Sequence, residues 1–492
     1  MTKTPAVGGR KVAIDVLGTA ALQVIAKARG LILLPIIIRA GGEALYGGWT
    51  LLGGIVAFMV PLANLSAHQG LMRYAAPVGA PDARTLFRRV TAFSWTTASL
   101  TSLAVAAFVF TLGSTSAWYA APAIIGFTAA QVPLLVAVRV NSSYLRARGR
   151  VAAAQLTELT AQLVMTLAVC VVFLAAGSLG MAQGVAAAVL FVQVALVTAW
   201  TLKSRDLLPN VSSSAAAGLR PVLAFSAPLV PGAISDWALF IADRYILAAF
   251  HGPTTVGIYA ACYSLAQGLQ LASYPVEYAI APLLPRLWDG DERRRAVDLL
   301  RRSTNFVLMV LAPGSTVASI VGPPLFRLLG LRATADQATL LLPIVCWGIT
   351  IFAFTRLLGH VCLVANRGRA VMVRVGATAA INIALNLALV PSLGAVGAAL
   401  ATLGSYAIYC VLILRLAREI APEAVHLQLP TRICVAALAP APIALLPFGS
   451  DAARVGGAFA YLVIYAGLCA ALHVVVRDDW ELLVRTVRRR KA

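Results

Sequence analysis

Several long apolar runs of this sequence contain charged side chains. Lys27 and Arg29 lie near the middle of the first run, and Asp236 lies near the middle of the seventh. If such runs cross a membrane, each ionisable residue costs about 2.5–3.5 kcal/mol on insertion scales and usually marks a ligand or ion pathway. Basic residues at that depth can bind anions, because arginine donates paired hydrogen bonds to phosphate oxygens.

Other charged residues lie nearer the ends of their runs. Asp243 and Arg244 lie toward the outer end of the seventh run. Glu158, Glu277 and Arg356 lie in the cytoplasmic thirds of the fifth, eighth and tenth runs. We predict that four residues line a polar cavity, namely Lys27, Arg29, Arg356 and Asp236. We assign gating or ion coupling to Asp236, Asp243, Arg244, Glu158 and Glu277.

These assignments have structural alternatives. Arg356, Glu158 and Glu277 can instead extend to the membrane interface. Asp243 and Arg244 can instead pair with neighbouring helices. Asp236 and Asp243 are seven residues apart and therefore share a helix face. Pro228 and Pro231 precede them, so the sequence predicts a bend at the start of the seventh run.

The composition shows what positions these residues. Of 492 residues, 60% are hydrophobic and 12% are charged, whereas soluble domains are about 45–50% apolar and 25% charged. Mean hydropathy is +0.85. The sequence therefore predicts a polytopic membrane protein.

Fourteen apolar segments are long enough to cross a bilayer. They do not alternate polar and apolar residues, so they predict helices and exclude a β-barrel. The segments are 13–38, 45–66, 90–112, 117–138, 152–176, 179–202, 221–249, 256–285, 303–322, 338–364, 371–391, 394–414, 433–449 and 455–476. We expect an all-α protein with about 14 transmembrane helices.

The basic residues indicate the orientation. With the N-terminus in the cytoplasm, 32 of the 40 Lys and Arg residues fall on cytoplasmic sides, as the positive-inside rule requires. The sequence thus predicts a multi-pass protein of the bacterial inner membrane with both termini cytoplasmic. The net charge of +21 follows from this bias and from contacts with anionic lipids, so we expect no nucleic-acid partner.

Signatures of enzymes and cofactor sites are missing. The seven cysteines form no CxxC pair, and the five histidines are scattered, so no metal site or cofactor is predicted. Neither a P-loop nor a GxSxG motif occurs. No loop exceeds about two dozen residues, so we expect no enzyme.

Two stretches suggest an internal repeat. Arg148-Gly149-Arg150 and Arg367-Gly368-Arg369 each precede an apolar run, which Ser178-Leu179-Gly180 and Ser392-Leu393-Gly394 follow in turn. A weaker similarity relates the residues around Gly42, before the second run, to those around Gly252, before the eighth run. Both pairs fit a shift of six spans, which predicts two pseudo-symmetric six-helix lobes. We expect an N-terminal lobe over 1–210, a C-terminal lobe over 211–420, and two extra spans with a basic tail over 421–492.

Residues 381–402, INIALNLALVPSLGAVGAALAT, resemble the span 11–12 signature of polysaccharide exporters and O-antigen flippases. These belong to the multidrug/oligosaccharidyl-lipid/polysaccharide exporter superfamily. Pro391 and Gly394 make a tight turn, and Gly397 allows close helix approach. Residues 39–48 and 242–259 are similar to the family's passages between spans 1 and 2 and between spans 7 and 8.

The resemblance implies flipping of an undecaprenyl-diphosphate-linked oligosaccharide from the cytoplasmic to the periplasmic leaflet by alternating access, for surface or exopolysaccharide biosynthesis. It implies roles for Arg29 and Asp243-Arg244, whereas Lys27 and Arg356 are chosen by depth alone. The implied partners are the lipid-linked glycan and membrane lipids, with polysaccharide polymerases and glycosyltransferases as further candidates. Proton or sodium coupling through Asp236 and the membrane potential are alternative energy sources.

Two rival functions stay open, a small-molecule exporter and a membrane enzyme, and the sequence disfavours a peptidoglycan-precursor flippase. Peptidoglycan-precursor flippases carry an acidic residue after the span 1 arginine, where this chain has Gly30. Drug/sodium antiporters of the superfamily usually stop at twelve spans. A membrane polysaccharide polymerase or ligase generally has a long outer catalytic loop, which is missing here.

Overall fold

A computed structural model gives the fold of this chain. It describes residues 9–111, 122–175, 177–203, 218–281, 283–290, 292–446 and 448–474, with side chains at the N-terminal end from Arg29 onward. Throughout these ranges the secondary structure is helical, and no strand occurs. The predicted all-α class is confirmed. The side chain of Lys27 lies outside the described residues.

The helices divide between two compact units. Unit 1 comprises residues 1–261 and 375–398, and unit 2 comprises residues 262–374 and 399–492. The lobe boundaries expected at residues 210 and 420 stay a prediction.

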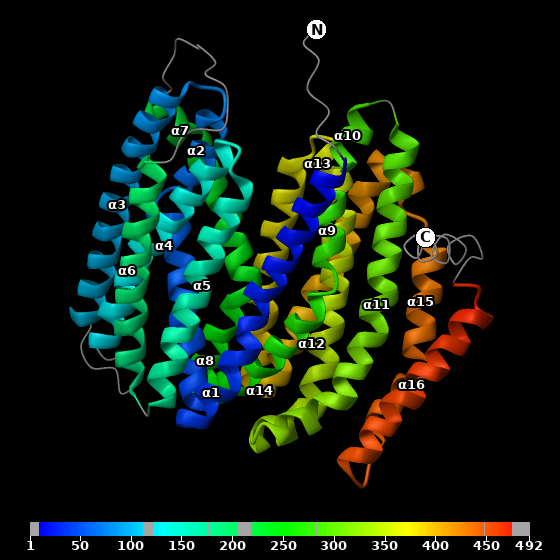
Figure 1. The fold of residues 1–492 in the computed structure, drawn as a ribbon. Coiled ribbons are helices and arrows are strands. Elements are labelled where there is room, and N and C mark those ends of the chain that lie inside the picture. The colour runs from blue at the N-terminus through cyan, green and yellow to red at the C-terminus, as the bar shows by residue number, and fades with distance from the viewer. Residues whose placement is uncertain are drawn as a thin grey trace. The chain divides into compact units, whose positions relative to one another are not determined.

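Unit 1 holds the first seven α-helices and parts of two long helices (Figure 1). Its elements are α1 (Gly9–Ala63), α2 (Ala67–Ala75), α3 (Ala80–Thr111), α4 (Pro122–Ala147), α5 (Val151–Leu174), α6 (Leu179–Lys203), α7 (Leu219–Ser226), the 3-10 turn η2 (Ala227–Leu229), and parts of α8 (Val230–Gln270) and α14 (Gly368–Ile420). The turn η2 contains Pro228 and interrupts the α-helix before Asp236, at the place where the sequence predicts a bend.

Unit 2 holds the remaining parts of α8 and α14 and the C-terminal helices. Its other elements are α9 (Tyr274–Ile280), α10 (Leu283–Asp289), α11 (Arg293–Leu328), α12 (Arg332–Leu358), α13 (His360–Val364), η3 (Pro422–Ala424), α15 (Gln428–Leu438), η4 (Ala441–Leu445) and α16 (Asp451–Ala471).

Three helices contain an interior glycine with positive φ. These are Gly42 (φ 74°) in α1, Gly252 (φ 75°) in α8 and Gly394 (φ 56°) in α14. A helix of 53 residues such as α14 would be about 80 Å long, well beyond the roughly 30 Å hydrocarbon core. Each of the three is therefore two spans joined at a glycine turn.

Ten helical segments of the described residues qualify as candidate membrane spans. Three of them contain the glycine turns, and α3 corresponds to the predicted third span. The segments thus account for all fourteen predicted runs.

Several predicted boundaries are wrong, because helices continue past their apolar residues. The fourth run was expected to end at residue 138, but α4 continues to Ala147. Likewise α3 begins at Ala80 and α11 at Arg293, ten residues before their apolar runs. Backbone hydrogen bonds do not stop where the side chains become polar. Arg139 and Arg146, expected in a loop, are therefore helical.

Helix α4 is the centre of unit 1. It packs against α1, α2, α3, α5 and α6, and in Figure 1 it lies among these helices. Val132, Val136 and Val140 on one face join the buried cluster with α2 and α3. Leu134 and Val138 on another face pack with α5 and α6. Two apolar faces at helical spacing thus leave a third face of α4 for polar residues.

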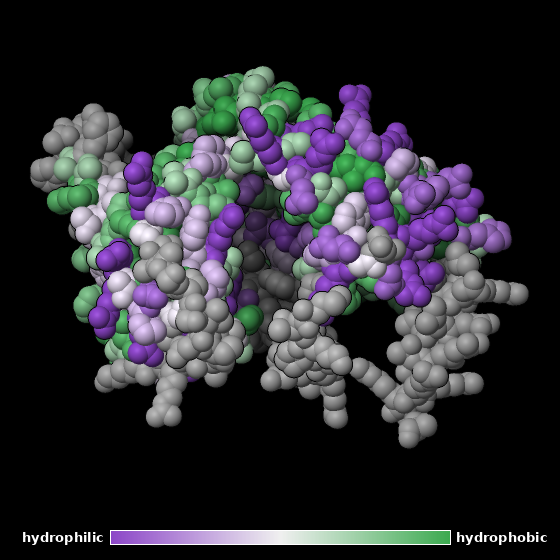
Figure 2. Space-filling view, turned by 90° about the horizontal axis from the view of Figure 1, so that it is seen from above, coloured by the Kyte–Doolittle hydropathy of each residue, from purple (hydrophilic) through white to green (hydrophobic). Residues whose placement is uncertain are grey.

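Hydrophilic residues gather on the end of unit 2 that Figure 2 shows. This is the end where α10, α13 and the start of α11 lie in Figure 1. Exposed arginines there include Arg286, Arg294 and Arg367. Arginine also caps helix ends, because the Arg293 side chain donates to the last carbonyl of α14, Ile420 O. A cation at a helix C-terminus is favoured by the helix dipole.

The two glycine turns at Gly42 and Gly252 have the same backbone conformation. Their ψ angles are −177° and 175°. Each turn starts a helical half, and a second glycine follows five residues later, Gly47 after Gly42 and Gly257 after Gly252. A Cβ on Gly47 would lie 1.9 Å from Pro253 O, and a Cβ on Gly257 would lie 1.8 Å from Glu43 O. The two contacts are reciprocal, because the equivalent residues Gly47 and Gly257, and likewise Glu43 and Pro253, lie 210 positions apart in the sequence. The two halves therefore cross at a pseudo-twofold axis.

The structure aligns the stretches around Arg148 and Arg367 with a sequence shift of 217 residues. The two tripeptide pairs of the sequence give unequal shifts instead. Gly149 (φ 76°) and Asn366 (φ 58°) are the left-handed residues of matching turns. The backbone N–H of the next residue donates a 2.8 Å hydrogen bond to the carbonyl five positions earlier. Arg150 N donates to Leu145 O, and Arg367 N donates to Cys362 O. Gly177 and Gly394 differ by the same 217 residues. The structure thus shifts the Arg-Gly-Arg alignment by two positions and supports the repeat.

We expect Gly47→Ala to destabilise the protein by about 1–3 kcal/mol, as overpacking of a close contact does. Gly53→Ala is the matched control, since a Cβ there meets nothing within 4 Å and alanine favours a helix by up to about 1 kcal/mol. Thermal unfolding midpoints in detergent would measure both. Equal midpoints for the two variants would contradict the close crossing.

In unit 2 the hairpin of α15 and α16 is held to α11 by a bond that proline makes necessary. Pro313 has no amide hydrogen, so the carbonyl of Met309 one turn earlier lacks its helical donor. The Tyr465 hydroxyl donates to Met309 O over 3.0 Å. Arg327 of α11 also pairs with Asp451 at the start of α16. The last two spans are thus an integral part of unit 2.

We expect Tyr465→Phe to cost about 1–3 kcal/mol, because it leaves the half-buried Met309 carbonyl without a donor. In a Pro313→Ala background the same change should cost less, since the alanine would supply the missing helical N–H. Unfolding midpoints of the four variants form a double-mutant cycle. Additive effects would exclude the proposed dependence of the tyrosine on the proline.

Candidate functional site

The first half of α8 carries the predicted acidic residues, and two aromatic side chains set its rotation in unit 1. Trp237 Nε1 donates to Gly54 O over 2.8 Å, and the Tyr245 hydroxyl donates to Leu51 O over 2.5 Å. A Cβ on Gly54 would lie 2.6 Å from the Tyr245 hydroxyl oxygen, so only glycine allows this approach. The rotation places Asp236 and Asp243.

Asp236 and Asp243 share a helix face but not an environment. The side chain of Asp236 is exposed, whereas Asp243 is 2% exposed. Seven residues correspond to about 10 Å along a helix, so the two carboxylates do not form one site. Only Asp236 is accessible to a ligand.

Asp243 joins the two halves of α8. Its Oδ2 accepts a 2.6 Å hydrogen bond from the Tyr259 hydroxyl, and its Oδ1 accepts one of 2.8 Å from the Arg244 backbone N–H. The Arg244 side chain is half-buried. The resemblance between residues 242–259 and the family passage thus has a physical basis, because Asp243, Gly257 and Tyr259 all hold this turn together.

Two buried asparagines of unit 1 were not among the predicted site residues. Asn382 and Asn386 lie one turn apart on α14 and are fully buried. Asn386 Nδ2 donates to Asn382 O over 2.9 Å, whereas Asn386 Oδ1 has no hydrogen-bond partner within the described residues. Amides at i and i+4 within an apolar run were the signal that could have found them. A buried free acceptor can accept a donor or a cation.

Glu277 and Arg356 form an ion pair in unit 2. Arg356 Nη2 contacts Glu277 Oε2, and Ser273 Oγ lies 3.4 Å from the other carboxylate oxygen. The Glu277 side chain is 9% exposed and that of Arg356 is 43% exposed. The carboxylate is thus neutralised internally, while part of the guanidinium stays accessible.

Glu158 is paired in unit 1. Its Oε2 accepts a 2.9 Å bond from Arg146 Nη2, and its Oε1 accepts a 2.5 Å bond from Ser142 Oγ. Both partners are on α4, so the carboxylate connects α5 to α4. Glu158 is a structural link as well as a candidate coupling residue.

Arg29 is half-buried in α1. Its guanidinium makes no hydrogen bond or ion pair to another residue that the structure describes. Lys27, two residues earlier, belongs to the same helix, and its side chain is outside the described residues. An arginine in a span with its donors available suits an anionic ligand.

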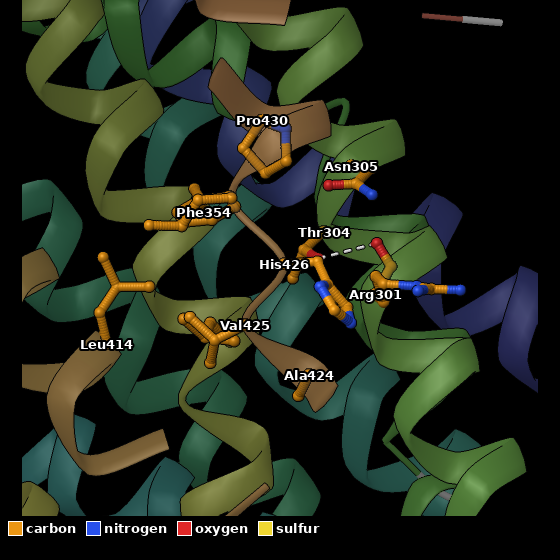
Figure 3. Close-up of a pocket in the computed structure, with 11 residues that line it drawn as sticks. Arg301, Thr304, Asn305, Phe354, Leu414, Ala424, Val425, His426 and Pro430 are labelled. Atoms are coloured by element: carbon orange, nitrogen blue, oxygen red, sulfur yellow. Dashed lines mark hydrogen bonds between the residues drawn. The ribbon is translucent and has the colours of Figure 1, made fainter. Parts of the chain in front are cut away.

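A small recess with a cavity volume of about 10 Å³ opens at the arginine-rich end of unit 2 (Figure 3). Arg301 and Asn305 of α11 line it together with Phe354, Leu414 and the segment before α15. The Arg301 guanidinium points away from Phe354 and Leu414 in Figure 3 and pairs with Asp298 over 3.0 Å. Ligand pockets usually measure about 300–1,000 Å³. The recess is too small for a lipid-linked glycan.

Metal and redox sites do not emerge from the described residues. No group of three or more His, Cys, Asp or Glu side chains there could hold a metal ion. All seven cysteines are free thiols. The charged side chains of unit 1 suit anion binding by arginine and proton or cation exchange by carboxylates.

We expect Tyr259→Phe to destabilise the protein more than Tyr263→Phe does. Both tyrosines are fully buried on α8, but Tyr259 bonds to a carboxylate and Tyr263 bonds to the Tyr406 hydroxyl over 2.9 Å. Hydrogen bonds to charged groups contribute about 1.5–3 kcal/mol, compared with about 1 kcal/mol for neutral pairs. Unfolding midpoints in detergent test this ranking. The reverse order would contradict the conclusion that Asp243 stabilises the turn of α8 through Tyr259.

Comparison with known proteins gives the fold a context. A family model described as MatE matches residues 228–388. No curated protein matches the sequence. The solved structure of lipid II flippase MurJ in an inward closed conformation is 12% identical, covers 94% of this chain and 99% of its own, and has a TM-score of 0.70.

Two multidrug transporters are also similar in structure. The MATE multidrug transporter DinF-BH, solved as a ligand complex, is 14% identical over 86% of this chain and 98% of its own, with a TM-score of 0.57. An inward-facing MATE family transporter of the MOP superfamily is 12% identical over 84% and 98%, with a TM-score of 0.59. This chain therefore has the fold of MurJ and of the MATE transporters, and it matches the MatE model over residues 228–388.

Proposed function

We propose that this chain is a flippase that moves undecaprenyl-diphosphate-linked oligosaccharide repeat units from the cytoplasmic to the periplasmic leaflet by alternating access. The transported glycan would serve surface or exopolysaccharide biosynthesis. The proposal places the protein in the bacterial inner membrane with both termini in the cytoplasm.

The observation that carries the proposal is the extent of the fold match. The flippase structure covers 94% of this chain, whereas the two MATE structures cover 84–86%. The resemblance of residues 381–402 to polysaccharide exporters points the same way. We therefore favour a lipid-linked substrate over a free small molecule.

The side chains of unit 1 suit the headgroup of such a substrate. A diphosphate needs cationic donors inside the membrane, and among the described residues the Arg29 guanidinium has no hydrogen-bond or ion-pair partner. Lys27 would add a second charge, and Asp236 is the accessible carboxylate for proton or sodium exchange. In unit 2, Arg356 is a further candidate for anion binding, because Glu277 leaves part of its guanidinium exposed.

Gating would involve the charged residues that the structure pairs. Asp243 and Arg244 lie beside the turn at Gly252, and Glu158 and Glu277 each link two helices through arginine. A movement that separates these pairs would expose a carboxylate and allow it to take up a cation. The membrane potential acting on Arg29 is the alternative energy source.

A cation-coupled exporter of small molecules is the second candidate. The MatE match over residues 228–388 and the two MATE structures favour it. A strain that lacks this chain would then become sensitive to drugs, and its lipid-linked glycans would stay normal. The flippase proposal predicts the opposite pattern.

We expect Arg29→Ala to trap intact repeat units on the cytoplasmic leaflet, because the diphosphate loses a charge-assisted hydrogen bond of about 1.5–3 kcal/mol. The measurement is the leaflet distribution of undecaprenyl-diphosphate-linked glycans in a strain that carries only the variant. Transport should fall at least about tenfold.

Arg29→Lys is the matched control, since it keeps the charge and should retain part of the activity. Normal export by Arg29→Ala and Lys27→Ala at the wild-type protein level would refute the role of these residues in the cavity. Repeat units that reach the periplasm but stay unpolymerised would instead indicate a polymerase.

A further inference from the structure

Arg139 is a charged residue inside a span that none of the preceding roles uses. It lies on α4, eight residues before Ala147, or about 12 Å from the end of the helix. Its side chain is exposed, and it makes no hydrogen bond or ion pair to another described residue. A helix of 26 residues is about 39 Å long, so Arg139 lies about 7 Å inside a centred 30 Å hydrocarbon core.

The neighbours of Arg139 gather on the polar face of α4. Ser142 and Arg146 follow at i+3 and i+7 and therefore share its face. The Arg146 guanidinium does not extend outward to the interface but turns inward to Glu158, at 2.9 Å. With Ser142 on the other oxygen at 2.5 Å, Glu158 already has a partner for each carboxylate oxygen.

The cluster has an excess positive charge. Arg139 lies close enough to both Arg146 and Glu158 to interact electrostatically. Two guanidinium groups and one carboxylate leave a net charge of +1, and the pair of Arg146 with Glu158 leaves that charge on Arg139. An uncompensated guanidinium within a span is costly, so an anion that reaches it would be bound strongly.

His68 of α2 is the third member of the cluster, because it lies close enough to Arg139 and Arg146 to interact with both electrostatically. Its Nδ1 is buried and has no hydrogen-bond partner in the described residues. Burial, reinforced by the nearby Arg139 and Arg146, lowers the pKa of His68 to about 3. The imidazole is thus neutral at pH 7, and it can donate one hydrogen bond to an anion without adding charge.

We propose that Arg139, Arg146 and His68 form a phosphate-binding site on the polar face of α4, and that its ligand is the diphosphate of a prenyl-linked substrate. The site rests on the proposed flippase function and adds a binding position separate from Arg29. Arginine provides two parallel donors for a phosphate, and the depth of the site favours a headgroup that enters the protein over one that stays at the membrane surface.

The test measures binding to the full-length protein in lipid nanodiscs. The probe is farnesyl diphosphate, and phosphatidylglycerol and inorganic diphosphate are compared with it. We expect Arg139→Ala to weaken farnesyl diphosphate binding at least about tenfold and Arg139→Lys to weaken it less. Arg89→Ala is the matched control, because Arg89 is also exposed on a helix of unit 1, α3, and it should bind as the wild type does.

A second variant gives a result that a purely structural role would not. Glu158→Gln removes the only carboxylate of the cluster and releases Arg146, so it should bind farnesyl diphosphate several-fold more tightly. This gain also keeps the test decisive if Arg139→Ala fails to fold. Unchanged or weaker binding by Glu158→Gln would overturn the site.

The outcomes separate the site from the proposed function. Wild-type binding with no loss in Arg139→Ala would refute the site and leave the flippase proposal standing. A loss of phosphatidylglycerol binding alone would assign the cluster to a phospholipid and also refute the site. A wild-type protein that ignores farnesyl diphosphate and exports no glycan would refute both.

Discussion

The reciprocal backbone contact at Gly47 and Gly257 is the constraint on which the rest of unit 1 depends. Any side chain at either glycine would overlap the carbonyl of Pro253 or Glu43. Because the contact brings the starts of two helical halves together, it sets where span 2 meets span 8. The glycine turns at Gly42 and Gly252, five residues earlier in each half, then direct spans 1 and 7 away from the crossing. A contact between backbones has no interlocked side chains, so rotation about it disrupts little packing.

The buried charges follow a consistent pattern around this framework. Asp243, Glu158 and Glu277 each have at least one partner, from Tyr259, Arg146 and Arg356. A carboxylate removed from water without such partners would be protonated or would destabilise the fold. The arginines differ, because the guanidinium groups of Arg29 and Arg139 make no hydrogen bond or ion pair to another residue that the structure describes. In the described part of unit 1, Asp243 and Glu158 are thus paired while two arginines stay accessible, which is consistent with the proposed anionic ligand.

Much of the fold could be predicted from the sequence, since helix count, the bend at Pro228 and the turn at Gly394 depend on local residues. The partners of the charged residues could not, because they lie far apart along the chain. Arg148 illustrates the difference. By sequence alone, Arg148 counts as a basic loop residue on the cytoplasmic side. In the structure its side chain is 1% exposed and donates to Ala75 O and Val78 O, about seventy residues earlier. Arg139 was missed because the apolar run ends before the helix does.

The same reasoning explains why depth alone was an incomplete guide to the site. Asp236 was chosen for its depth, and Asp243 was chosen for its place within a span and for the family resemblance, yet only Asp236 is accessible. Arg29 and Arg356 were also chosen, and Glu277 already neutralises Arg356. What distinguishes a binding residue from a structural one is whether its hydrogen-bonding groups are satisfied within the protein. That property depends on the rotation of each helix, and Trp237 and Tyr245 determine the rotation of α8 through carbonyls of a helix nearly two hundred residues earlier.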